Sequence, residues 1–169
     1  MMLTIQQAKA LSDEIVKRLE PYCQKIQVAG SVRRERPTVH DIDIVLIASD
    51  IEAIHKELVG LGELQKDGPK LKCVEYKDVS VDLYFATPQT WATLLLIRTG
   101  SRENNIRLCA RARTLGMHLA ASGDGLFDQE GVRIAGDTEE SIFQQLGLPY
   151  KEPQQDFFYL FIIYVQTIS

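Results

Sequence analysis

Two aspartates separated by one residue, Asp41 and Asp43, stand at the start of the apolar run Ile42 to Ala48. Side chains two positions apart in a strand point to the same face of a sheet. Both carboxylates should therefore face one space, where their repulsion would raise a pKa unless a cation intervened. Because Mg²⁺ takes oxygen ligands, the pair predicts a divalent-metal site at the head of a strand.

A third acid, Asp82, lies inside another apolar run, Val79 to Phe85. A carboxylate in a buried strand needs a compensating partner, and a metal shared with the first two acids would supply one. Three carboxylates on neighbouring strands suit a two-metal centre, whose ions contact the attacking and leaving oxygens of a phosphoryl transfer. The predicted cofactors are two Mg²⁺ ions, with Mn²⁺ as a substitute.

A glycine, a serine and three arginines precede the acids. Gly30 permits close backbone approach, and Ser31 offers a hydroxyl and an N–H group to a phosphate. Arginines can neutralise a triphosphate by bidentate contacts, and those in this stretch are Arg33, Arg34 and Arg36. The alternative interpretation, in which the paired acids only solubilise a strand end, leaves this combination unexplained.

The elements that would hold these residues form an α/β unit over residues 1–87. A capping box at Thr4 and Gln7 predicts an opening helix, and Asp50 predicts an N-cap for a second one. Lys77-Asp78 separates two apolar runs and predicts a hairpin. The predicted strands occupy residues 26–29, 42–48, 72–76 and 79–85.

Residues 88–156 are predicted to form a second unit that mixes helices and strands. Thr87-Pro88 has the residue types of an N-cap and a first helical position. Helical sequence follows, with a break at Thr99-Gly100-Ser101. Gly-rich punctuation within residues 117–135 predicts a small hairpin, and Asp137 is the predicted N-cap of a last helix.

The composition and the features of the two chain ends limit the class of protein. The chain has 169 residues, 45% of them hydrophobic and 25% charged, which excludes a disordered or disulfide-stapled chain. The N-terminus lacks the basic and apolar regions of a signal peptide. The apolar tail, residues 157–169, is shorter than the roughly 20 residues of a membrane-spanning helix, and its role is unknown. We therefore expect a soluble, cytoplasmic protein without a membrane partner.

The acids and the basic loop resemble signatures of the family X DNA polymerases, the DNA polymerase beta-like nucleotidyltransferases. Gly-Ser-x-Arg-Arg followed by Asp-x-Asp reads here Gly30-Ser31-Val32-Arg33-Arg34 and Asp41-Ile42-Asp43. A narrower signature, Thr-Gly-Ser before an asparagine-bearing helix, reads Thr99-Gly100-Ser101 through Arg107. The first signature is shared by all nucleotidyltransferases, whereas the second points to a template-using polymerase. The resemblance covers residues 3–153.

This resemblance implies an α+β fold in a minimal form, without a lyase domain before it. A nucleotidyltransferase palm, which is a mixed sheet flanked by helices, would occupy residues 1–87, and a small α/β thumb residues 88–156. The implied reaction is metal-dependent nucleotidyl transfer from a dNTP to a DNA primer 3′-hydroxyl in short-gap DNA repair synthesis. Gapped or nicked DNA would be the partner, an accessory protein is a further candidate, and the oligomeric state stays open.

The matching positions imply roles for single residues. Asp41, Asp43 and Asp82 would be both the catalytic residues and the metal ligands. The implied nucleotide-binding residues are Gly30, Ser31, Arg34, His40, Thr99, Gly100 and Asn105. The implied DNA-binding residues are Arg102, Arg107 and Arg111.

Several positions depart from the family pattern. Ile97-Arg98 stands where the family has an aromatic pair, which leaves the exclusion of ribonucleotides open. Cys109 stands where the family commonly has an arginine for the minor groove. Ser80, two positions before Asp82, stands where animal members of the family place an arginine that contacts the acids.

Charge alone does not identify the partner. The net charge is −4, whereas proteins that bind polyanions are usually basic, but residues 97–113 hold five arginines and one glutamate. Two other functions stay open: a template-independent nucleotidyltransferase acting on RNA, protein or a small molecule, and a catalytically weak module that binds DNA ends. The intact acids argue against the second of these.

Overall fold

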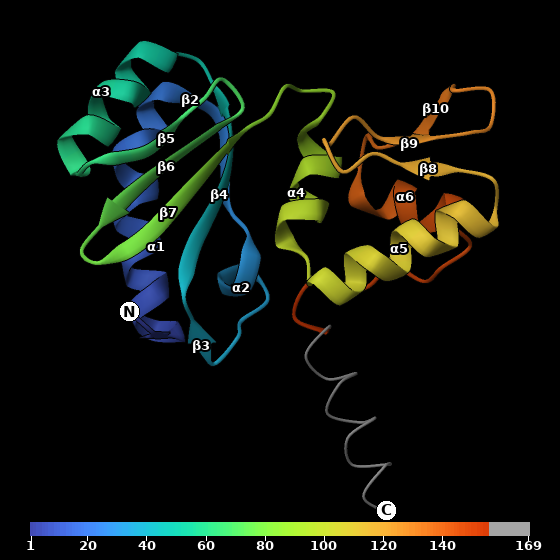
Figure 1. The fold of residues 1–169 in the computed structure, drawn as a ribbon, viewed down its shortest axis with the longest axis horizontal. Coiled ribbons are helices and arrows are strands. Elements are labelled where there is room, and N and C mark those ends of the chain that lie inside the picture. Colours follow the sequence, from blue (N-terminus) through green and yellow to red (C-terminus); the bar gives the residue numbers. More distant parts are fainter. Residues whose placement is uncertain (156–169) are drawn as a thin grey trace, which may run out of the picture.

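The computed structural model describes residues 1–155, so the apolar tail at residues 157–169 lies outside the described residues. The chain forms two lobes joined by residues 86–90 (Figure 1). Their mixture of helices and sheets confirms the predicted α+β class. In the described part of the chain, no helix is both long and apolar enough to cross a membrane.

The first lobe is built on a five-stranded mixed sheet in the order β2-β4-β7-β6-β5. Strands β4 and β7 run parallel, and the other neighbours run antiparallel. The elements of this lobe are β1 (Leu3–Thr4), α1 (Ile5–Leu19), the 3₁₀ helix η1 (Glu20–Tyr22), β2 (Cys23–Val28), α2 (Gly30–Arg33), β3 (Thr38–Val39), β4 (Asp41–Ala48), α3 (Ile51–Leu61), β5 (Leu64–Asp67), β6 (Leu71–Tyr76) and β7 (Val79–Phe85).

Local sequence signals explain several of these elements. The Thr4 side chain accepts from the Gln7 backbone, and the Gln7 side chain accepts from the Thr4 backbone, so the predicted capping box of α1 is confirmed. The hairpin between β6 and β7 is confirmed as well. Its turn residues Lys77 and Asp78 have φ values of 53° and 61°, as the twist of a two-residue hairpin turn requires.

The two faces of the sheet bury different partners. Alternate residues of β4, Ile42 and Ile44 among them, pack with α1 and α3 on one face. The other alternate residues, Val45 and Ile47, pack with Tyr84 and with α4 (Trp91–Thr99) on the opposite face. Since Asp41 and Asp43 continue the second series, the acids stand on the α4 side of the sheet.

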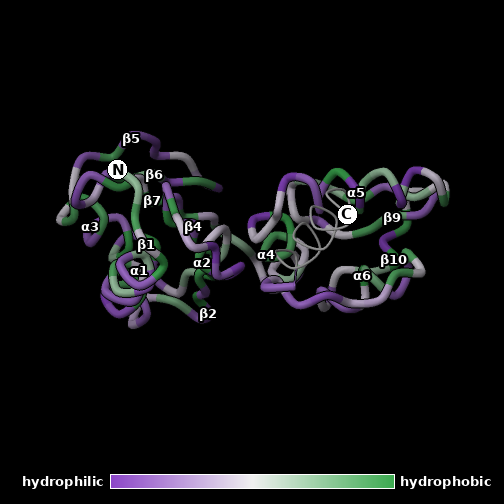
Figure 2. Tube along the Cα trace, turned by 90° about the horizontal axis from the view of Figure 1, so that it is seen from below, coloured by the Kyte–Doolittle hydropathy of each residue, from purple (hydrophilic) through white to green (hydrophobic). Residues whose placement is uncertain are grey.

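The second lobe is a small α/β unit around its own apolar cluster. Its strands form a three-stranded antiparallel sheet in the order β10-β9-β8, where the sequence predicts only a small hairpin. Figure 2 shows α4 at the junction of the lobes. The other elements of this lobe are α5 (Arg102–Thr114), β8 (His118–Leu119), β9 (Leu126–Phe127), β10 (Arg133–Ala135) and α6 (Glu139–Gln145).

The predicted start of α4 is wrong by three residues. Thr87 and Thr90 close a turn, in which each backbone N–H donates to the hydroxyl of the other at 2.9 and 3.3 Å. Pro88 lies inside this turn, and the helix starts at Trp91. A local turn of hydroxyl-bearing residues thus competes successfully with the helix start that the Thr-Pro pair indicates.

The predicted cap of α6 is also displaced. Thr138 is the N-cap, and its hydroxyl accepts from the Ser141 backbone N–H at 3.1 Å. Asp137 instead accepts from Arg133 at 2.8 Å. The arginine on β10 draws the carboxylate away from the helix, and the neighbouring threonine takes over the capping role.

Candidate active site

The three predicted acids gather at one end of the parallel pair β4 and β7. Asp43 and Asp82 are register partners, and Asp41 lies two positions before Asp43. Burial first, and then the charges of Asp41 and Asp82, raise the pKa of Asp43 to about 7. The Arg34 guanidinium acts in the opposite direction. The structure therefore brings three carboxylates into mutual electrostatic contact, as the strand spacing predicts.

Divalent ions suit this arrangement by the chemistry of its donors. Among residues 1–155, no three His, Cys, Asp or Glu side chains are already assembled as a metal cluster, so the carboxylates would adjust around an ion. Every converging donor here is a carboxylate oxygen, the ligand that Mg²⁺ prefers. A bound cation would also relieve the repulsion that contributes to the raised pKa of Asp43.

Gly30 explains how a loop can lie directly against Asp43. Its φ is +55°, which side-chain-bearing residues rarely adopt. A Cβ at this position would lie only 2.9 Å from Cγ of Asp43 and would collide with its Oδ2. The preceding Ala29 N–H donates to the Asp43 carbonyl at 2.8 Å. Glycine is therefore required for α2 to start beside the acid.

Asp41 and Asp43 open into a cleft of about 520 Å³ between the lobes, whereas Asp82 is not among the residues that line it. The first lobe contributes Gly30, Ser31, Arg34, Asp41 and Asp43 to its walls. The second lobe contributes the end of α4 and one face of α5. The cleft thus joins residues that lie more than 50 positions apart in the sequence, on both sides of the Thr99-Gly100-Ser101 break.

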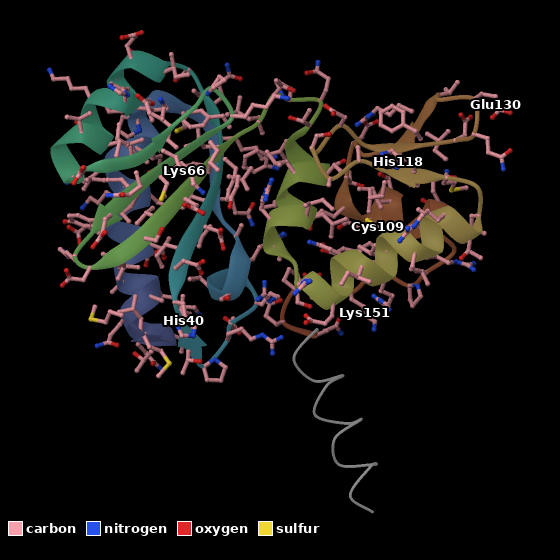
Figure 3. All side chains as sticks on the ribbon, in the orientation of Figure 1. His40, Lys66, Cys109, His118, Glu130 and Lys151 are labelled. Atoms are coloured by element: carbon pink, nitrogen blue, oxygen red, sulfur yellow. The ribbon has the colours of Figure 1, made fainter. Side chains whose placement is uncertain are left out.

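Two predicted nucleotide-binding residues do not line the cleft. His40 is exposed between β3 and β4 and lies away from Cys109, which marks the cleft side of α5 (Figure 3). Thr99 is buried and makes internal contacts, while its neighbour Gly100 reaches the cleft. His40 directly precedes Asp41, so its backbone lies beside the acids, but it is not among the residues that line the cleft.

The neighbouring arginines of the basic loop point to different places. The Arg34 guanidinium donates to the Thr99 carbonyl and lies 3.3 Å from the Ser31 hydroxyl, at the wall of the cleft. Arg33 makes a bidentate ion pair with Glu139 of α6, at 2.7 and 3.0 Å. It also donates to the Thr99 hydroxyl at 2.8 Å. Arg33 therefore joins the two lobes, contrary to its predicted role in neutralising a triphosphate.

The predicted helix break at Thr99-Gly100-Ser101 is confirmed. Gly100 has φ +69° and ends α4, and the peptide bond to Ser101 is cis. The Ser101 hydroxyl then accepts from the Asn104 N–H as the N-cap of α5. Asn105 lines the cleft and donates from Nδ2 to the Ile97 carbonyl at 2.8 Å. Its Oδ1 is buried and has no hydrogen-bond partner among the described residues.

Of the three predicted DNA-binding arginines, only Arg102 lines the cleft. Arg107 donates to Asn104 at 2.9 Å, and Arg111 donates to the Leu146 carbonyl at 2.9 Å. Their roles at DNA stay predictions. Arg113 reaches the cleft face instead.

Five cleft residues are absent from the predicted site, namely Ile97, Arg98, Ile106, Cys109 and Arg113. The signal for two of them was available, because Ile106 and Arg113 lie 4 and 11 positions after Arg102. Those spacings put all three side chains on one helix face. Arg98 had no such signal, since it depends on how α4 packs against the sheet.

Comparisons with known proteins agree with this architecture. Residues 94–155 match the family model of the DNA polymerase beta thumb. The chain is 25% identical over 156 residues to DNA polymerase/3′-5′ exonuclease PolX of Bacillus subtilis (strain 168), a match that covers 87% of this chain and 27% of that protein. It is also 25% identical over 174 residues to Repair DNA polymerase X of African swine fever virus (isolate Pig/Kenya/KEN-50/1950). This match covers 91% of this chain and 99% of the viral protein. The chain therefore spans about a quarter of the first relative and nearly all of the second.

Solved structures give the same fold. A ternary P/T complex of Leishmania infantum polymerase beta has a TM-score of 0.77 at 19% identity, covering 91% of this chain and 76% of that one. A ternary gap complex of the same polymerase has a TM-score of 0.77 at 18% identity, and the match covers 91% of this chain and 70% of that one. The thumb match, the PolX relatives and the two-lobed fold together support a family X DNA polymerase.

Proposed function

We propose that this chain is a DNA-directed DNA polymerase, which transfers a nucleotidyl group from a dNTP to a primer 3′-hydroxyl in short-gap repair. One observation carries the proposal: Asp41 and Asp43, with Asp82 as the register partner of Asp43, stand at a cleft that α5 also lines. Helix α5 lies inside the part of the chain that matches a polymerase beta thumb. The name of the viral relative, a repair polymerase, and the gap complex of a structural neighbour support the repair role.

The acids would perform the catalysis. Asp41 and Asp43 would hold two divalent ions, and Asp82 would bind beside them and orient the primer 3′-hydroxyl. When bound, such ions supply charge stabilisation at the attacking and leaving oxygens. The Tyr84 hydroxyl donates to Oδ2 of Asp82 at 3.3 Å, which fixes the orientation of that carboxylate on β7.

The cleft walls around the acids would hold the nucleotide. Ser31 and Arg34, 3.3 Å apart, present a hydroxyl and a guanidinium on one side of the acids. They would bind phosphate oxygens by charge-assisted hydrogen bonds. Gly100 would lie beneath the sugar, and Asn105 would exchange its bond to the Ile97 carbonyl for the minor-groove edge of the incoming base.

The face of α5 that lines the cleft would contact the duplex. Arg102 and Arg113 flank Ile106 and Cys109 along the cleft, so two cations are available for phosphates of the template strand or the primer strand. Contacts of this kind position DNA without reading its sequence, which is what a polymerase needs.

Primer extension on three substrates tests the proposal. The same labelled primer is offered as a single strand, as a nicked duplex and as a duplex with a one-nucleotide gap, each with Mg²⁺ and all four dNTPs. We expect filling of the gap and little addition to the single strand. Addition to the single strand as efficient as to the gap would favour the template-independent alternative. Tight DNA binding without any addition would favour the end-binding module.

A further inference from the structure

Arg98 lies on the face of α4 that packs against the sheet. Trp91 and Leu94, seven and four positions earlier on the same helix face, belong to the apolar cluster that also contains Val45 of β4. Asp43 is two positions before Val45 on the same face of that strand. Along this face of α4, the apolar residues are followed by Arg98, and along the facing side of β4 the apolar residues are preceded by Asp43. Arg98 and the acids therefore lie at the same end of the contact between helix and sheet.

The guanidinium of Arg98 is held over an aromatic ring rather than by an anion. Its Cζ lies 4.2 Å from the centroid of the Tyr84 ring, a cation–π geometry. The Tyr84 hydroxyl in turn donates to Asp82. The ring thus fixes Arg98 and one of the acids at the same time.

Arg98 forms none of the ion pairs found within residues 1–155. Its Nε is buried and has no hydrogen-bond partner among these residues. By contrast, Arg33 has Glu139, and Arg34 donates to the Thr99 carbonyl. Arginine stays charged at all relevant pH values, and a partly buried, unpaired charge is costly. Because Arg98 also lines the cleft, an anionic ligand in the cleft can reach the unused donors.

We infer that Arg98 is a further nucleotide-binding residue, which donates to a phosphate oxygen of the incoming nucleoside triphosphate while the Tyr84 ring supports its guanidinium plane. The identity of the anion as a triphosphate rests on the proposed function. The family resemblance gives an aromatic residue at this position, so the contact distinguishes this chain from the family pattern. Arg98 would then be a third phosphate donor in the cleft besides Ser31 and Arg34, and it would come from α4.

Calorimetric binding separates the phosphate contact from other roles. Wild type and Arg98→Gln are titrated with dTTP, dTMP and inorganic tripolyphosphate, with Ca²⁺ as a non-catalytic cation. Loss of a charge-assisted hydrogen bond should weaken dTTP and tripolyphosphate about tenfold and dTMP much less. Arg98→Lys should retain part of the affinity. The matched control is Arg18→Gln, which removes an equal charge from the outer face of α1, where Arg18 pairs with Glu57, and should bind like wild type.

Two outcomes would overturn the inference. Unchanged triphosphate affinity in Arg98→Gln would leave the guanidinium without a ligand role. An equal loss for dTTP and dTMP together with no loss for tripolyphosphate would assign Arg98 to the sugar or base. If Arg98→Gln does not fold by circular dichroism, Arg98→Phe replaces it, with the same expectation, since it carries the family's residue type.

Primer extension by the same proteins distinguishes this inference from the proposed function. Binding that depends on Arg98 in a wild-type protein that extends no primer would contradict the polymerase and leave the triphosphate contact standing. Efficient gap filling together with a triphosphate affinity that does not depend on Arg98 would support the polymerase and contradict the Arg98 contact.

Discussion

Single residues set the electrostatics of the site, and Asp43 is the clearest case. It is partly buried, lies near two other carboxylates and leaves no room for a side chain at Gly30. Sequence spacing predicts that the acids share a face, because that follows from the strand period alone. The need for a glycine against the acid could not be predicted in this detail, since it depends on a distance between the start of α2 and strand β4.

Gly30→Ala should damage both stability and activity. The new methyl group collides with the Asp43 carboxylate, and the backbone keeps a φ of +55° that alanine disfavours. We expect a loss of about 2 kcal/mol or more in the free energy of unfolding, measured by urea denaturation, and primer extension reduced to background.

Gly60→Ala is the matched control. Gly60 lies inside α3, and a Cβ there meets nothing within 4 Å. We expect a gain of about 0.5–1 kcal/mol, the usual advantage of alanine over glycine in a helix. A Gly30→Ala protein as stable as wild type would contradict the contact with Asp43.

Asp43→Asn should separate stability from function. Without metal, and at a pH above the raised Asp43 pKa of about 7, the substitution removes one of three neighbouring negative charges. The melting temperature in EDTA should rise by about 2–4 °C, which corresponds to about 1 kcal/mol in a chain of this size. The stabilisation that Mg²⁺ gives wild type should disappear with the activity. Asp50→Asn, which keeps an N-cap residue on α3, is the control; a lower melting temperature for Asp43→Asn in EDTA would refute the repulsion.

Helices and strands bring the distant residues of the site together, and their placement could be predicted only in part from the sequence. The hairpin and the break before Ser101 follow from local chemistry and were predicted correctly. The start of α4 was misplaced because a threonine turn replaces the first helical turn. The contact between Arg33 and Glu139 joins α2 to α6 across 106 positions, and no local pattern reports a pairing of that range.

The Arg33–Glu139 pair should contribute measurably to stability. Both side chains are mostly buried, with 15% and 12% exposed, and the pair is bidentate. Glu139→Gln leaves the Arg33 charge uncompensated and should cost about 1–3 kcal/mol. A double-mutant cycle with Arg33→Met and Glu139→Gln, read by urea denaturation, isolates the coupling.

The control cycle uses Lys9 of α1 and Glu35 of the turn after α2, which pair at 2.8 Å but are 48% and 52% exposed. Their coupling should lie near 0–0.5 kcal/mol, as for other exposed pairs. Equal coupling in the two cycles would show that the Arg33 contact does not hold the lobes together.

At the scale of the whole molecule, the net charge of −4 misleads, because charge is distributed unevenly. Arginines gather around the end of α4 and along α5, while most residues after 113 that carry charge are acidic. Sequence therefore predicts a nucleic-acid contact once the charges are located. The face that makes it could not be chosen from sequence, since Arg111 turns toward α6 and Arg113 toward the cleft. The division between a palm and a thumb at residue 87 stays a proposal, because α4 packs with both lobes.

DNA affinity should be modest and depend strongly on salt. Arg102→Gln and Arg113→Gln should each lower the slope of log affinity against log salt by about 1, measured by fluorescence anisotropy on gapped duplex. Arg111→Gln should lower stability, through its lost bond to the Leu146 carbonyl, and leave the slope nearly unchanged. Equal slopes for wild type and both cleft variants would remove that face of α5 from the DNA interface.

The central claim is that the three acids catalyse the template-directed addition of a nucleotide, and one measurement tests it directly. A one-nucleotide gap is offered with each dNTP in turn, opposite each of the four template bases, to wild type and to Asp82→Ala. We expect the complementary nucleotide to be added with Mg²⁺ by wild type, and no addition by Asp82→Ala at equal DNA binding. Addition of all four nucleotides regardless of the template base, or undiminished addition by Asp82→Ala, would contradict it.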